Sequence, residues 1–167
     1  MEATQRHYTI FKTLLWLTLG GCTLHFFDNV IFFDQYPEPA WLNAPVVAAL
    51  WFPLALAAWR AHTTLSGNQP DRVYTLIQGF VVGNWLSFGH YLFANPVDVL
   101  PRINAIIAIQ TTLATALFCY SLWMQVSFHR DSLPYFRRIW VKLMVFYGVT
   151  ILALEWVWPS DFQTWWL

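Results

Sequence analysis

Histidine, carboxylate and amide side chains interrupt the apolar stretches of this chain, and these residue types bind metal ions or move protons. The first stretch carries His25, Asp28 and Asn29. Because His25 lies three residues before Asp28 and four before Asn29, a helix places all three on one face. An ionisable side chain inside a membrane costs about 2.5–3.5 kcal/mol, so a cluster of them indicates a functional site. Later stretches add Asn84, Trp85, His90, Gln110 and Glu155.

These groups support more than one chemistry. The imidazoles and carboxylates of His25, Asp28, His90 and Glu155 could ligate a divalent metal ion, and the two histidines could instead hold a haem. A histidine and a carboxylate one helical turn apart could also exchange a proton with a substrate. We therefore take His25 and Asp28 as the proton-handling or ligating pair. The sequence leaves the identity of the metal or cofactor open.

The elements that must position these groups are membrane-spanning helices. Of the 167 residues, 57% are hydrophobic, 19% are aromatic and only 11% are charged, against roughly 25% charged in a soluble domain. So little charge excludes a disordered chain, a coiled coil and a nucleic-acid-binding domain. We expect one all-α domain, residues 1–167, that forms a polytopic membrane bundle.

Proline-rich or polar segments divide the chain into five apolar stretches. A helix needs about 20 apolar residues to cross the hydrocarbon core of a bilayer. The second stretch has only fifteen and contains Pro53, so whether it crosses completely is left open. The predicted spans are 14–33, 45–59, 73–94, 103–126 and 139–158.

The basic residues lie almost entirely on one side of these spans. Cytoplasmic segments carry the excess of Lys and Arg in membrane proteins. The N-terminus is therefore predicted inside and the C-terminus outside, in a multi-pass protein of a prokaryotic plasma membrane. Arg102 is the one basic residue on the outer side. The other eight are Arg6, Lys12, Arg60, Arg72, Arg130, Arg137, Arg138 and Lys142.

Polar groups from different spans fall in the same half of the membrane. A rise of about 1.5 Å per residue places Asp28 and His90 within about 9 Å of the outer boundary, and His25 about 14–16 Å deep. This count predicts a polar pocket in the outer half of the bundle, but it separates His25 from His90 by about 6–7 Å along the membrane normal. Gly21, on the same face as His25, favours a close helix contact.

Two functions of different classes follow. In the first, the pocket binds a lipophilic small molecule or cofactor at His25 and Asp28, and its other ligand-contacting residues are Asn29, Asn84, Trp85, His90, Gln110 and Glu155. In the second, the chain is a non-catalytic accessory subunit of a larger membrane protein complex. The expected partners are the lipid bilayer, together with a lipophilic ligand or other membrane proteins, and no nucleic acid. No reaction is assigned.

Overall fold

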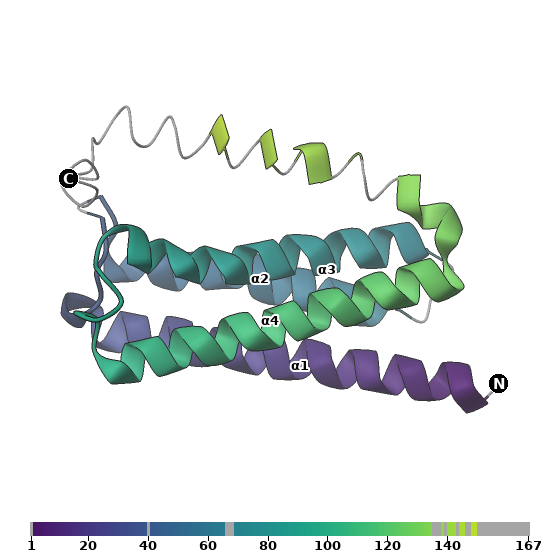
Figure 1. Ribbon diagram of the computed structural model, residues 1–167, viewed down its shortest axis with the longest axis horizontal. Helices are drawn as coiled ribbons and strands as arrows, with labels where there is room; N and C mark the ends of the chain where they lie inside the picture. The colour runs from purple at the N-terminus through teal and green to yellow at the C-terminus, as the bar shows by residue number, and fades with distance from the viewer. Residues whose placement is uncertain are drawn as a thin grey trace.

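The regular structure of the described residues is entirely helical. The computed structural model describes residues 2–39, 41–65, 69–134, 138, 140–142, 144, 145, 148 and 149. Four long helices run up and down alternately, and each packs against two others, so that the first and the last close a bundle (Figure 1). The expected all-α fold is confirmed. The helices are α1 (Glu2–Ile31), α2 (Ala44–Thr64), α3 (Pro70–Trp85) and α4 (Pro101–Phe128).

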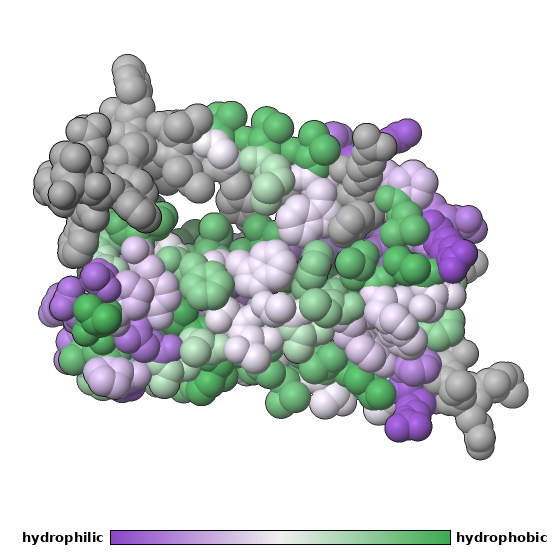
Figure 2. All heavy atoms as spheres, viewed as in Figure 1, coloured by the Kyte–Doolittle hydropathy of each residue, from purple (hydrophilic) through white to green (hydrophobic). Residues whose placement is uncertain are grey.

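Three of these helices are long and apolar enough to cross a membrane. They span Gln5–Ile31, Ala44–Thr64 and Pro101–Phe128. Figure 2 shows hydrophilic side chains gathered toward the two ends of the described bundle, with apolar ones between them. This distribution suits a body whose middle lies in lipid and whose ends face water.

The helix α2 is longer than the fifteen-residue stretch predicted from the sequence. It has 21 residues and continues through Pro53. Asn43 caps its first turn, because the Asn43 Oδ1 atom accepts a hydrogen bond from the backbone N–H of Val46 at 3.0 Å. The polar cap and the residues beyond 59 supply the length that a purely apolar count missed.

The third apolar stretch forms two elements where one span was expected. The α-helix ends at Trp85, and a 3₁₀ helix, η2 (Leu86–Leu92), follows it. The hydroxyl of Ser87 donates to the backbone carbonyl of Asn84 at 2.8 Å, which is a local bond that competes with the α-helical ladder. Since a 3₁₀ helix rises about 2.0 Å per residue, this change shifts the level of every residue beyond it.

The fifth predicted span, 139–158, lies mostly outside the described residues. Residues 140–142, 144, 145, 148 and 149 are described, and they are helical. The candidate site residue Glu155 lies outside the described residues.

Small residues let α1 approach α4 closely. A Cβ atom added at Gly21 would lie 3.1 Å from Leu113 Cδ1 and 3.6 Å from Gln110 Cα. On the same face, the Thr18 hydroxyl lies 3.2 Å from the backbone carbonyl of Leu113 and donates to it. Because His25 follows Gly21 by one helical turn, this contact also holds His25 close to α4.

Gly21→Val should loosen the contact between α1 and α4. The added side chain must displace Leu113 and meets the α4 backbone, so we expect a loss of about 1–3 kcal/mol of stability. Thermal unfolding in detergent measures the change. Gly20→Val is the matched control, because an added Cβ there meets nothing within 4 Å. Equal melting temperatures for the two variants would contradict the close contact.

Candidate functional site

Two buried histidines from different elements meet at one end of the bundle. His25 lies on α1 and His90 on η2, and their Nε2 atoms are 3.1 Å apart. The ring centroids are 5.2 Å apart and the planes differ by 22°. The 5.2 Å between the ring centroids is less than the predicted offset of 6–7 Å, so the two rings meet although the count placed their residues at different depths. That count assumed level helix ends and an α-helical rise throughout, whereas the segment holding His90 is a 3₁₀ helix.

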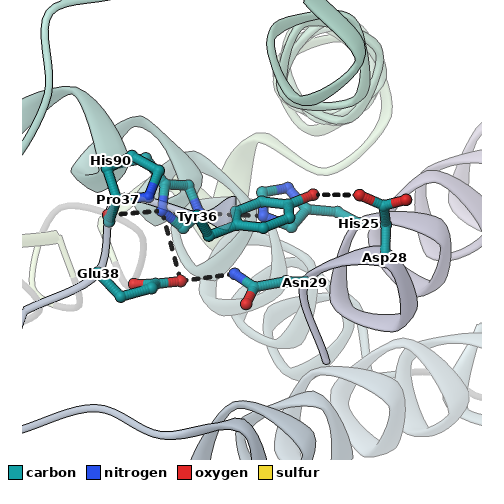
Figure 3. A network of polar contacts seen from close by, with 7 residues as sticks. All are labelled: His25, Asp28, Asn29, Tyr36, Pro37, Glu38 and His90. Atoms are coloured by element: carbon teal, nitrogen blue, oxygen red, sulfur yellow. Dashed lines mark hydrogen bonds and ion pairs between the residues drawn. The ribbon is translucent and has the colours of Figure 1, made fainter. Parts of the chain in front are cut away.

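The loop after α1 covers the histidine pair. The Nδ1 atom of His90 is 3.4 Å from the backbone carbonyl of Pro37 and 3.5 Å from the Oε1 atom of Glu38 (Figure 3). The amide of Asn29 donates to the same Glu38 oxygen at 2.5 Å. The Tyr36 ring packs 5.7 Å from the His25 ring and 5.3 Å from the His90 ring, centroid to centroid. Residues 36–38 thus separate the imidazoles from the solvent at this end.

Sequence reasoning missed Glu38 as a member of the site. It treated this carboxylate as an ordinary loop charge, because Glu38 lies between spans rather than within one. The usable signal was the Tyr-Pro-Glu-Pro segment, in which Pro37 and Pro39 flank the carboxylate. Proline restricts both its own backbone and that of the residue before it, so such a segment can hold a side chain in one place.

Asp28 contacts Tyr36 and Arg102, and not His25 as expected. Its Oδ2 atom accepts a hydrogen bond from the Tyr36 hydroxyl at 2.8 Å and lies 3.5 Å from the Arg102 guanidinium. Arg102 also donates to Gln35 Oε1 at 2.9 Å and lies 4.0 Å from the centre of the Phe32 ring. The expected pairing of His25 with Asp28 is therefore replaced by two others. The cation of Arg102 draws Asp28 outward, and His25 contacts His90.

Two buried amides extend the cluster into the bundle. Asn84 Nδ2 donates to the backbone carbonyl of Phe80 at 2.7 Å, and Gln110 Nε2 donates to Asn84 Oδ1 at 2.9 Å. The side chain of Gln110 also interacts with His25. Of the three predicted amides, Gln110 thus interacts with His25 directly, Asn84 holds Gln110, and Asn29 binds Glu38. Trp85 points elsewhere, since its indole N–H donates to the Thr115 hydroxyl at 3.1 Å.

The electrostatics of the covering loop depend on burial. Burial raises the pKa of Glu38 to about 7, although the hydrogen bond from Asn29 opposes this shift. Near neutral pH the contact between Glu38 and His90 is therefore not a permanent ion pair. Burial and the hydrogen bond to Asp28 also raise the pKa of Tyr36, which keeps its hydroxyl protonated as a donor.

The arrangement offers two imidazole nitrogens to a proton or to a metal ion. Within the part of the chain that the structure describes, no group of three or more His, Cys, Asp and Glu side chains is arranged to hold a metal ion.

A hollow in the described surface lies at the opposite end of the bundle from the histidines. Its lining residues are Leu133, Pro134, Arg138, Val141 and Lys142.

Comparisons with protein families, with curated proteins and with solved structures find no match to this chain. Its function must therefore be inferred from the chemistry of the site.

The stability of the protein should fall as the pH rises from 4.5 to about 7, because Glu38 titrates at different pH values in the folded and unfolded chain. The folded state keeps the Glu38 proton to about pH 7, whereas an unfolded chain loses it near 4.5. Between these values the folded state binds more protons, so the free energy of unfolding decreases with increasing pH. Glu38→Gln should flatten this dependence, which thermal unfolding between pH 4.5 and 8 would measure.

The exposed acid Asp98, near the same end of the bundle, gives the control variant Asp98→Asn. This variant should keep the slope of the wild type between pH 4.5 and 7. An identical slope in Glu38→Gln would show that Glu38 does not carry the effect.

Proposed function

We propose that this chain is a multi-pass membrane protein that binds a small ligand or cofactor at the cluster around His25 and His90. The observation that carries the proposal is the contact of the two buried Nε2 atoms at 3.1 Å, next to the carboxylate of Glu38. Three ionisable groups thus meet at one place: His25 from α1, His90 from η2, and Glu38 from the loop that follows α1. Buried ionisable groups in contact are typical of functional sites.

A purely structural role explains the cluster less well. Hydrogen bonds between membrane helices are worth about 0.6 kcal/mol each on average, while ionisable groups in lipid cost several times more. Neutral amides already connect the helices, through Gln110 and Asn84 at one level and through Gln78 and Gln125, 3.5 Å apart, at another. The Thr18 hydroxyl, which donates to the Leu113 carbonyl, likewise joins α1 to α4 without an ionisable group.

The charge distribution supports an orientation with the N-terminus inside and the site toward the outer face. The N-terminus and the loop joining α2 to α3 lie at one end, and the loops next to the histidines lie at the other (Figure 1). Basic residues favour the first end, and Arg102 is the exception. By the positive-inside rule, the first end faces the cytoplasm.

The packing around the histidines favours a small occupant. The Tyr36 side chain is only 6% exposed, and its ring lies against both imidazoles. A bulky lipophilic molecule would have to displace this ring. An ion or a small cofactor group would need only the space between the two nitrogens and a small shift of the loop.

Protein purified from its native membrane in mild detergent should carry the occupant. We expect an absorption band, a stoichiometric element or an extractable small molecule in the wild type, and at least a tenfold loss in His25→Gln and in His90→Gln. These variants remove the imidazole ligand while keeping a polar side chain. Spectroscopy, elemental analysis and mass spectrometry measure the content.

His62→Gln is the control, because His62 lies near the opposite end of α2. This variant should keep the full content. A folded wild-type protein that carries nothing would contradict the proposal.

Cysteine labelling tests the orientation. Asp98 and Gln69 are both exposed and lie at opposite ends of the bundle. In a Cys119→Ser background, an impermeant maleimide should label Asp98→Cys on intact cells, and Gln69→Cys only after lysis. The reverse pattern would invert the topology and place the histidine site on the cytoplasmic side.

An accessory-subunit role is the second candidate, and the surface of α2 favours it. Phe52, Leu56 and Trp59 expose 65%, 56% and 54% of their surface on one face of this helix. Lipid or another membrane protein would cover them. A partner chain that co-purifies in fixed ratio, without which this chain is unstable, would support the subunit role.

A further inference from the structure

We infer that His25 and His90 bind one first-row transition-metal ion, of the zinc or copper type, through their Nε2 atoms. This inference rests on the proposed function and names the class of cofactor. The inference depends on which nitrogen of each ring carries the hydrogen. At His90 a backbone carbonyl determines this directly, and at His25 a backbone carbonyl determines it through two amides.

For His90, the deciding group is the carbonyl of Pro37. A carbonyl oxygen only accepts hydrogen bonds, so its contact with His90 Nδ1 at 3.4 Å requires a hydrogen on that nitrogen. Glu38 lies 3.5 Å from the same nitrogen and favours the same arrangement when it is ionised. In a neutral imidazole, the Nε2 atom of His90 then carries a lone pair.

For His25, the deciding group is the carbonyl of Phe80, which acts through two amides. It accepts from Asn84 Nδ2, which leaves Asn84 Oδ1 to accept from Gln110 Nε2. The Oε1 atom of Gln110 is thereby left as an acceptor. That atom and His25 Nδ1 are both buried and have no hydrogen-bond partner in the structure. Because Gln110 is the amide that interacts with His25, we assign the hydrogen of His25 to Nδ1, which leaves a lone pair on its Nε2 atom.

Two nitrogen lone pairs that face each other at 3.1 Å repel unless a cation lies between them. A proton or a metal ion can supply the positive charge. A metal ion fits the surroundings, because histidines that bind metals usually donate their other ring N–H to a carboxylate, a carbonyl or water. His90 has such partners in Pro37 and Glu38, and Gln110 is the neighbour to which we assign this role at His25.

The separation of the nitrogens also suits one metal ion. Zinc–imidazole bonds of about 2.0–2.1 Å would place the two nitrogens at an angle of about 100° at the metal. This angle lies near the tetrahedral value, and neutral imidazole suits zinc and copper. No third His, Cys, Asp or Glu joins the pair among the residues that the structure describes. Water or a substrate would then complete the coordination, as in catalytic metal sites.

Asp28 is not expected to be a ligand, although it lies one turn from His25. Its carboxylate is held by the Tyr36 hydroxyl and lies next to Arg102. Moving it to the histidines would break both contacts. Glu38 has the indirect role of holding the His90 ring, so it is a positioning residue.

The test is a titration of metal-free protein in detergent with Zn²⁺ alone and with Cu²⁺ alone, in competition with a chromophoric chelator. We expect one ion per chain. His25→Gln and His90→Gln should each lower the affinity at least tenfold. Glu38→Gln, which leaves both imidazoles in place, should lower it about 10–100-fold. Circular dichroism checks that each variant is folded.

His62→Gln and His129→Gln are the matched controls, because both histidines lie toward the other end of the bundle, and both should bind like the wild type. Binding that does not depend on His25 and His90 would overturn the inference. So would nitrogen NMR spectra showing a single proton shared by the two rings that neither metal displaces. If an organic ligand is lost in His25→Gln while no metal binds, this inference fails and the proposed function stands. If neither binds, both fail.

Discussion

The contact between the His25 and His90 Nε2 atoms is the constraint on which the rest of this end of the bundle depends. Two imidazoles that are 3% and 8% exposed cannot rely on water for their hydrogen bonds. Every neighbouring polar group must therefore supply the correct donor or acceptor. Pro37 and Glu38 do so for His90, and Gln110 is the amide that interacts with His25. The close approach of α1 to α4 at Gly21, one turn away, brings the pair within reach of that amide.

The two carboxylates near the pair have separate roles because their surroundings differ. Asp28 lies next to the half-exposed Arg102 and accepts from Tyr36, so it holds the covering loop from outside. Glu38 lies deeper, contacts Asn29 and His90, and has a pKa raised to about 7 by burial. One carboxylate therefore stabilises the loop from outside, while the other contacts the histidine pair from within the loop.

Two histidines at the opposite end of the bundle pair with tyrosine instead of with another imidazole. There His7 Nδ1 lies 2.9 Å from the Tyr120 hydroxyl, and His129 Nδ1 lies 2.9 Å from the Tyr74 hydroxyl. A tyrosine hydroxyl can donate to a neutral imidazole or accept from it, so these pairs are satisfied without an added cation. The pairing of imidazole with imidazole distinguishes the His25–His90 end. This difference is why our proposal of a bound cofactor rests on the cluster and not on every buried histidine.

The sequence by itself determined the helical class, the bounds of α4 to within two residues, and the shared face of His25, Asp28 and Asn29 on α1. These properties follow from composition and from the 3.6-residue period, which are local. Only the tertiary structure decided that His90 meets His25, that Asp28 turns to Arg102, and that Glu38 enters the site. Each of these depends on where a helix ends or how a loop folds back. A change from α to 3₁₀ geometry after Trp85, or the position of one arginine, sets such distances, and periodicity carries no information about them.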